Sequence, residues 1–271
     1  MAVVGKSRVA PAMRGRAAEA LKTTLPPALI FVAVITLWQL GVFHWLLRIQ
    51  TFQLPLPSQI IESFGRRSED LWVGMWYTLG EALGGLALGA GLGFITAALF
   101  VVSDPLRRGF MPIAASFNAM PIVAFAPIVT VWLGFDQITR IVVVAVMTFA
   151  PMVISAYKGL TSLDNNSLDL MRSYAASSVQ TFFKLRLPSS LPYVFSALKV
   201  GATASIIGSV IAEFFNSAGG IGKLISNNIQ SGDFALAWCG VVIVTLMGLF
   251  LYLAASLAER LAVPWEARQQ R

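Results

Sequence analysis

Long runs without a charged residue are the feature that most constrains this chain. Only 12% of its 271 residues are Asp, Glu, Lys or Arg, 56% are hydrophobic, and the mean hydropathy is +0.73. Soluble chains carry about twice that charged fraction. The long alternating pattern of a membrane β-barrel is absent from the sequence, so the apolar runs are predicted to be helices. The expected fold class is therefore an all-α membrane protein.

Six of these runs approach or exceed the ~20 apolar residues that a helix needs to cross a bilayer. A secretory signal is a weaker interpretation of the first run, which is too long for a signal core and is followed by no Ala-x-Ala-like site. We therefore predict a membrane domain at 23–258 between tails at 1–22 and 259–271. The predicted spans are 26–47, 80–102, 110–134, 139–157, 192–215 and 234–258.

The distribution of positive charge predicts the orientation. With six spans, both termini lie on one side, and the segments on that side hold fourteen of the twenty Lys and Arg residues. Five lie on the opposite side, and Lys199 falls within a span. Because cytoplasmic segments carry the excess of Lys and Arg, both termini are predicted to be cytoplasmic. The net charge of +7 is then explained by cytoplasmic segments, and no nucleic-acid partner is expected.

Two spans contain residues that alter helix packing. Gly85, Gly89 and Gly93 step by four along the second span, so they share a face where another helix can approach closely. A hinge is the alternative interpretation of these glycines. In the third span, Pro121 and Pro127 each remove a backbone donor, and Asn118 lies one turn before Pro121. This span is predicted to line a pathway, with simple kinked packing as the alternative.

The fifth span is the only one with charges well inside it, at Lys199 and Glu213. These residues are fourteen apart, so they share roughly one helix face, and Ser205 and Ser209 lie between them along the helix. Charges within a membrane usually face a bundle interior or a water-filled cavity. We expect this face to line the path together with Asn118, Pro121 and Pro127, with Glu213 at an external gate. Alternatively, Lys199 snorkels to the headgroups and Glu213 sits at the outer interface.

The cytoplasmic connection at 163–188 is predicted to be helical. Asp164 can cap a helix with apolar residues three apart at Leu168, Met171 and Tyr174. Ser177 or Ser178 can cap a second short helix, which Pro188 and Pro192 are expected to end before the fifth span. Two short helices of this kind suit docking into a cleft of another protein or lying among lipid headgroups.

This connection resembles the cytoplasmic signature of ATP-binding-cassette importer permeases, E-A-A-x3-G-x9-I-x-L-P, which contacts the ATPase subunit. The spacing is kept, but Asp169 stands at the Glu position, Leu170 and Met171 at the two Ala positions, and Ala175 at the Gly position. Residues 171–177 are similar to the A-R-x-L-G-A-S form of the nitrate, taurine and sulfonate group. The resemblance implies ATPase contacts at Asp169, Met171, Arg172, Tyr174, Ala175, Ala176, Ser177, Leu185, Leu187 and Pro188.

Three further stretches resemble the same group and extend the resemblance over about residues 76–257. They are Pro121-x5-Pro127 followed by Trp132-Leu133-Gly134, the run Thr148-Phe149-Ala150-Pro151, and Glu213 followed by Gly219-Gly220-Ile221-Gly222. The resemblance implies a type I ABC importer permease fold in the cytoplasmic (inner) membrane of a bacterium. It implies two ATP-binding subunits that hold ATP and Mg and an external substrate-binding protein. One signature loop and no internal duplication predict a second permease copy, in a homodimer rather than the alternative pair of unlike permeases. The implied substrate is a small polar solute such as nitrate, taurine, another sulfonate or a pyrimidine-type precursor.

No catalytic site is predicted in this chain. The stretch at Gly219–Lys223 lacks the spacing of a phosphate-binding loop, and the sequence contains neither G-x-S-x-G nor H-E-x-x-H. One His and one Cys make a metal site improbable, with His44 expected at the outer interface and Cys239 in helix packing. The alternative functions are an ion-coupled secondary transporter or channel and, more distantly, a membrane scaffold. Only the third span is strongly interrupted, whereas secondary transporters of this kind interrupt both halves.

Overall fold

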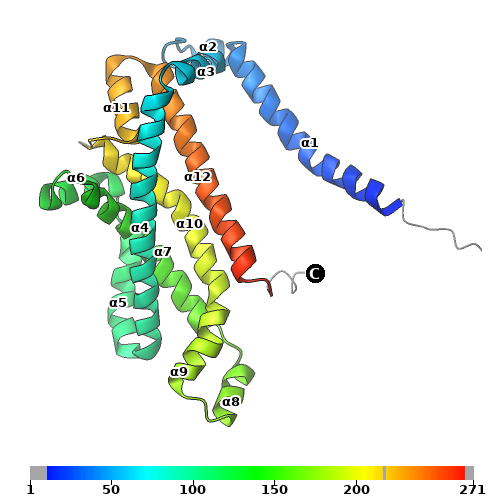
Figure 1. Ribbon diagram of the computed structural model, residues 1–271, viewed down its shortest axis with the longest axis vertical. Coiled ribbons are helices and arrows are strands. Elements are labelled where there is room, and N and C mark those ends of the chain that lie inside the picture. The colour runs from blue at the N-terminus through cyan, green and yellow to red at the C-terminus, as the bar shows by residue number, and fades with distance from the viewer. Residues whose placement is uncertain (1–10, 216–217, 266–271) are drawn as a thin grey trace, which may run out of the picture.

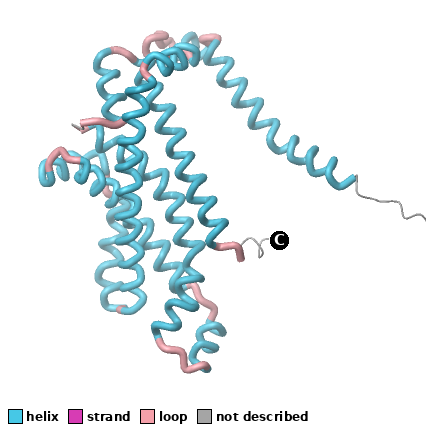
Figure 2. Tube along the Cα trace, viewed as in Figure 1, coloured by secondary structure: helices cyan, strands magenta, loops and turns pink. Residues whose placement is uncertain are grey.

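The computed structural model describes residues 11–215 and 218–265, with side chains described from residue 25 onward. The described residues form helices and loops and contain no strand (Figure 2). Residues 1–10 and 266–271 of the predicted tails lie outside the described part of the chain. The elements are α1 (Pro11–Gln39), α2 (Val42–Leu47), α3 (Pro57–Arg66), α4 (Ser68–Val102), α5 (Asp104–Ser116), η1 (Phe117–Ala119), α6 (Ile122–Leu133), α7 (Gln137–Thr161), α8 (Asn165–Ser173), α9 (Ser178–Thr181), η2 (Phe182–Arg186), α10 (Leu187–Phe214), α11 (Ile221–Ser231) and α12 (Phe234–Ala262).

Four helical segments in the described residues are long and apolar enough to cross a membrane. They are α4, α7, the continuous segment Ser178–Phe214 that ends in α10, and α12. The pair formed by α5 with η1 and α6 makes a fifth if it is counted as one span. The apolar part of α1, Leu25–Gln39, is shorter than a full span. The all-helical membrane class is confirmed, with four or five spans identified by length and composition, and the count of six remains a prediction.

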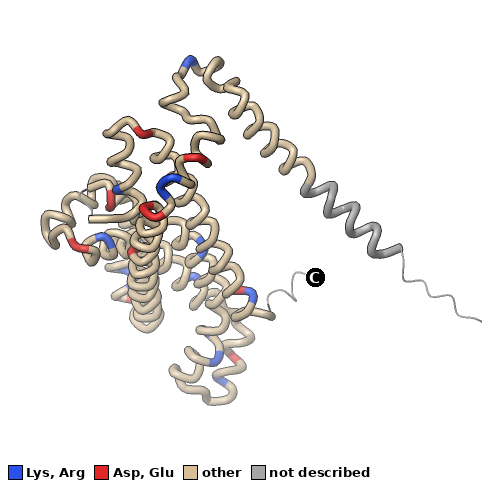
Figure 3. The backbone as a smooth tube through the Cα atoms, turned by 45° about the horizontal axis from the view of Figure 1, so that its top comes forward, with Lys and Arg blue, Asp and Glu red and all other residues tan. Residues whose placement is uncertain are grey.

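The helix body is ordered α4, α7, α10 and α12, each packed on the next (Figure 1). Long stretches of these helices carry no charged residue (Figure 3). The connecting elements α2, α3 and α11 gather at one end of the body, whereas α8 and α9 lie at the other end (Figure 1). Segments predicted on opposite sides of the membrane are therefore at opposite ends of the molecule.

The glycines of α4 allow α7 to approach closely. A Cβ at Gly85 would overlap the side chain of Val144, and one at Gly89 would overlap Thr148 and the backbone of Ala145. The backbones therefore meet where no side chain fits between them, as in other small-residue membrane interfaces. The prediction that these glycines serve helix packing is confirmed.

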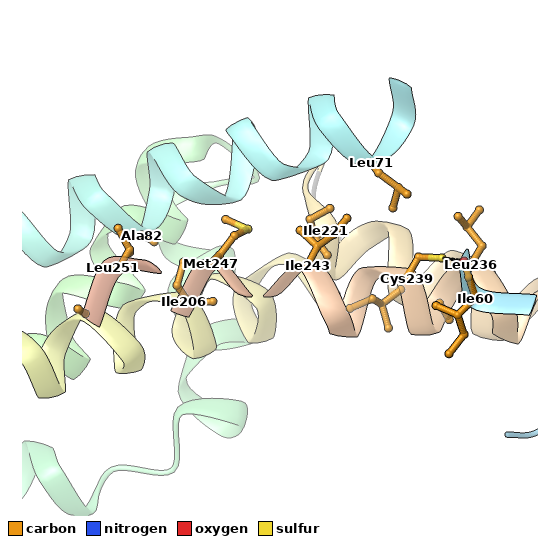
Figure 4. Close-up of a cluster of buried hydrophobic side chains, with 13 residues drawn as sticks. Ile60, Leu71, Ala82, Ile206, Ile221, Leu236, Cys239, Ile243, Met247 and Leu251 are labelled. Carbon is orange, nitrogen blue, oxygen red and sulfur yellow. Dashed lines mark hydrogen bonds between the residues drawn. The ribbon is translucent and has the colours of Figure 1, made fainter. Parts of the chain in front are cut away.

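A buried apolar cluster joins α12 to four other helices (Figure 4). Its largest fully buried members include Leu71 of α4, Ile206 of α10 and Ile221 of α11. Cys239 of α12 is also fully buried in this cluster, and its Sγ donates to the carbonyl of Ile60 at 3.1 Å. Cys239 is thus the small packing residue that the sequence predicts, and the cluster holds α11 against the body.

The third predicted span is broken at Met120 and Pro121. Both residues are extended, and α6 leaves at 105° to the preceding helix. A proline donates no hydrogen bond and disfavours helical backbone at the residue before it, which explains a break at this dipeptide. Pro127 lies inside α6 and does not interrupt it. The predicted kink is therefore a sharp turn between two helices.

Candidate functional site

The exposed segment at 163–188 contains a capped turn between α8 and α9. At the end of α8, the N–H of Ala176 donates to Met171 O at 3.0 Å and that of Ala175 donates to Arg172 O at 2.9 Å. This is the Schellman pattern, which places the residue after the helix in the left-handed region. Ala175 has φ 49°, so an alanine holds the bend at the position where the signature has glycine.

A reciprocal capping box begins α9. Ser177 Oγ accepts from the N–H of Gln180 at 3.2 Å, and Gln180 Oε1 accepts from the N–H of Ser177 at 2.8 Å. Of the two serines considered as caps, Ser177 is the one that serves. Asp164 precedes α8 as predicted, but its side chain makes no capping hydrogen bond.

The predicted end of the second short helix at Pro188 and Pro192 is wrong. The chain continues from α9 through the π-helical turn η2 into α10, so the helix runs from Ser178 to Phe214. Pro188 directly follows the π-helical turn, as the second residue of α10, and Pro192 lies inside α10. Arg186 Nη1 donates to Leu160 O at 2.8 Å and ties this junction to the end of α7.

The segment has an outer surface and an inner surface. Leu170 and Tyr174 are exposed on the outside, with Tyr174 75% exposed, whereas the exposed Val179 lies at the groove. Met171 and Phe182 turn inward and, with the end of α4, line a groove of about 910 Å³. Of the predicted ATPase-contact residues, Asp169, Arg172, Tyr174, Ala175 and Ser177 are exposed, whereas Met171, Ala176, Leu185, Leu187 and Pro188 are half-buried.

A buried polar cluster lies at the opposite end of the body. It consists of Tyr77, Thr78 and Glu81 of α4, Arg140 of α7 and Glu213 of α10. Arg140 Nε donates to Glu81 Oε1, and Arg140 Nη2 donates to the hydroxyl of Tyr77 at 2.6 Å. The side chains of Arg140 and Glu81 are 5% and 0% exposed. The cluster therefore contains an ion pair between α4 and α7 that is shielded from solvent.

Glu213 completes the cluster and fastens α11. Thr78 Oγ1 donates to Glu213 Oε1 at 2.7 Å, and the N–H of Gly222 donates to Glu213 Oε2 at 2.6 Å. The N–H of Ile221 donates to Thr78 Oγ1 at 2.9 Å, so the first turn of α11 is bonded to both helices. A Cβ at Gly220 would overlap the Glu213 carboxylate, and its φ of 100° also favours glycine. The G-G-I-G run thus lets the backbone close around this carboxylate.

The residues predicted to line a path are separated by the structure. Asn118 and Pro121 are exposed, and Pro127 is half-buried. Ser205, Ser209 and Glu213 are fully buried on the face of α10 that packs against α4 and α7. This face is closed in the present conformation. Lys199 is instead bonded to Glu259 of α12, with Nζ 2.8 Å from Oε2.

Sequence reasoning missed Glu81, Thr78 and Arg140 as parts of a site. The second span was predicted to begin at residue 80, which put Glu81 at its outer end, and Arg140 was counted among the outer positive charges. Both side chains are buried within helices that extend further than the charge-free runs. The available signal was a carboxylate at the start of the second predicted span and a guanidinium at the start of the fourth, because such residues pair within membranes.

The body, the exposed turn and the buried cluster define a multi-pass membrane protein with a capped helical connection at one end. Residues 89–266 match the family described as "Binding-protein-dependent transport system inner membrane component". The chain belongs to this family. Its relatives are transport permeases, which favours the predicted importer permease over an ion-coupled secondary transporter or an enzyme.

Named relatives align along nearly the whole chain. The formylaminopyrimidine transport permease protein ThiX of Halalkalibacterium halodurans is 26% identical over 248 residues, 90% of this chain and 97% of that protein. The riboflavin transport system permease protein RibX of Chloroflexus aurantiacus is 30% identical over 247 residues, 90% of each chain. The putative aliphatic sulfonates transport permease protein SsuC of Escherichia coli is 27% identical over 242 residues, covering 88% and 91%.

A solved structure shares the fold. A chain of the MetNI methionine ABC transporter in an inward-facing conformation superposes with a TM-score of 0.61 at 19% identity. The match covers 71% of this chain and 96% of that one. The chain thus has the fold of an ABC transporter and is the membrane permease of an ABC importer for small solutes.

Proposed function

We propose that two copies of this chain form a path for a small polar solute into the cytoplasm. Each copy would bind one ATP-binding subunit through residues 163–188, and an external substrate-binding protein would deliver the solute. ATP and Mg would be held by the ATPase subunits. The observation that carries this proposal is the exposed apolar tip at the capped α8–α9 turn, which is formed by Leu170, Tyr174 and Val179.

The tip has the properties of a docking surface. Leu170, Tyr174 and Val179 are 56%, 75% and 66% exposed, although apolar side chains of this size are usually buried. The Schellman turn and the capping box fix the backbone between them. A fixed turn loses little conformational entropy on binding, which favours docking into a cleft of another protein.

Co-purification of the ATPase tests the docking. Tyr174→Asp places a charge in the proposed contact and should abolish ATPase association, because an unpaired buried charge costs several kcal/mol. Asn166→Asp adds the same charge to an exposed position in the first turn of α8 and should leave association intact. Normal association and uptake in Tyr174→Asp would instead show that the segment lies among lipid headgroups.

Six spans with cytoplasmic termini remain part of the proposal. In this arrangement α1 with α2 provides the first span, and the bent pair α5–α6 provides the third. The protein would reside in the cytoplasmic (inner) membrane of a bacterium, with α2, α3 and α11 outside. The placement of α11 and of α8–α9 at opposite ends of the body supports this orientation (Figure 1).

Within the proposed solute path, the exposed break between α5 and α6 is the part that the structure supports most directly. Asn118 places a polar side chain beside Pro121 on an exposed surface, where a second copy could enclose water. Ser205, Ser209 and Glu213 would join the path only when α10 separates from α4 and α7. Cysteines at Ser205 and Ser209 should then react with aqueous reagents in a nucleotide-dependent manner, and constant protection would remove them from the path.

The solute class follows from the relatives, whose names specify sulfonates, riboflavin and formylaminopyrimidine. We propose a small polar organic solute of this range, with taurine and nitrate also to be tested. Ligand binding to the partner binding protein, followed by uptake into vesicles that contain the complete transporter, identifies the solute. Uptake driven by an ion gradient without ATP would overturn the importer mechanism.

A further inference from the structure

Two buried glutamates from different helices belong to the buried polar cluster, and both Glu81 and Glu213 are 0% exposed. Thr78 is one turn from Glu81 on α4 and bonds Glu213 Oε1 at 2.7 Å, so the two carboxyl groups lie close together in one bonded cluster. The pair therefore joins α4 to α10 where solvent is excluded.

The charges of the cluster do not balance. Arg140 is committed to Glu81 Oε1, to the carbonyl of Phe135 at 3.0 Å and to the hydroxyl of Tyr77. It makes no ion pair with Glu213 among the described residues. The cluster thus contains two carboxyl groups and one guanidinium, and a surplus negative charge in a site that excludes water is strongly unfavourable.

The hydrogen-bond acceptors are also in surplus. Both oxygens of Glu213 accept bonds, from Thr78 and from the N–H of Gly222. Glu81 Oε2 is buried and has no donor within the described part of the chain. An ionised carboxylate has no hydrogen to offer, so two ionised groups facing each other repel. One hydrogen between them satisfies Glu81 Oε2 and removes the surplus charge.

We propose that Glu81 and Glu213 bind one proton between them, and that this proton fastens the ends of α4 and α10 and the first turn of α11. With the proton bound, one negative charge remains to balance Arg140. When the proton leaves, the two carboxylates repel, and the bonds from Thr78 and Gly222 to Glu213 are strained. Release of α11 from the body is the expected structural consequence.

The other charged and titratable groups around the pair do not replace this proton. Tyr77 faces it from α4 and Arg140 from α7, and these two are bonded to each other. On α11, Lys223 follows Gly222, is half-buried and forms no ion pair with either glutamate among the described residues. Asp136, before α7, is exposed. Asp233, before α12, caps that helix by accepting from the N–H of Leu236.

Thermal unfolding of the purified full-length chain in detergent tests the proposal. A proton bound only by the folded state stabilises at low pH, and this stabilisation is lost as the pH rises. The wild-type melting temperature should fall by roughly 4 °C between about pH 6 and about pH 9. Glu81→Gln keeps an oxygen for Arg140 and supplies an N–H toward Glu213, so its melting temperature should not change over that range. Glu259→Gln removes a carboxylate of a separate ion pair and should keep the wild-type dependence on pH.

Infrared spectroscopy of the wild-type chain gives a second measurement that needs no stable variant. The C=O stretch of a protonated carboxyl group should be present at neutral pH, disappear on alkaline titration and be missing in Glu213→Gln. Absence of this band at neutral pH would overturn the proposal. So would an unchanged pH dependence in a folded Glu81→Gln protein. Stabilisation at high pH by Na⁺ but not by K⁺ would show that the pair binds a metal cation instead.

Discussion

Lys199 of α10 and Glu259 of α12 form an ion pair, with Nζ 2.8 Å from Oε2. The two side chains are 22% and 18% exposed, so the pair is shielded but not sealed from solvent. Lys199 is thereby held against a neighbouring helix. It neither extends freely to the headgroups nor faces an open path in this conformation.

Loss of one member of this pair should destabilise the protein more than loss of both. Lys199→Met leaves Glu259 partly buried without a partner and should cost about 1–3 kcal/mol in the free energy of unfolding. The double variant Lys199→Met with Glu259→Gln should recover part of that loss. A double-mutant cycle of unfolding in detergent measures the coupling, and strictly additive effects would show that the pair contributes nothing.

Close packing of α4 on α7 should make Gly89→Ala disruptive. Its Cβ would overlap Thr148 and the backbone of Ala145, and such overpacking typically costs about 1–3 kcal/mol. Gly91 is the matched control, because no atom lies within 4 Å of a Cβ built there. Gly91→Ala should be neutral or slightly stabilising in the same thermal unfolding experiment. Equal melting temperatures for both variants would contradict the close approach of these helices.

The left-handed conformation of Ala175 predicts that Ala175→Gly stabilises the turn after α8. An alanine at φ 49° is disfavoured by about 1–2 kcal/mol relative to glycine. Hydrogen exchange at the amides of residues 175 and 176 should therefore slow in the variant. Ala176→Gly, which changes the next residue, should not slow it. Faster exchange in Ala175→Gly would show that the turn is not held in this conformation.

Labelling of introduced cysteines checks the orientation. Ser68 and Ser178 are both exposed and lie near opposite ends of the body, whereas the native Cys239 is buried. A membrane-impermeant thiol reagent added to intact cells should label Ser68→Cys and leave Ser178→Cys unlabelled. The opposite pattern would reverse the orientation and place residues 163–188 outside, away from any ATPase.

Local physical chemistry made much of the fold predictable. Hydropathy identified the long helices because burying a span depends on the composition of about 20 consecutive residues. The caps and apolar spacing of residues 163–188 also act within a few positions, so the Ser177 cap and the bend near Ala175 could be anticipated. The start of the fifth span was predicted wrongly. The π-helical turn η2 joins α9 to α10, so the helix continues past Pro188 and Pro192.

The sequence by itself determined that this chain is a helical membrane protein with a structured connection at 163–188. Only the tertiary structure decided which charges meet. Glu81 and Arg140 are 59 positions apart, Thr78 and Glu213 are 135 apart, and Lys199 and Glu259 are 60 apart. Such pairs depend on which helix faces pack together, and the small residues that set this packing act through shape rather than hydropathy. The spacing of Lys199 and Glu213 on one helix therefore could not reveal that each has its partner on another.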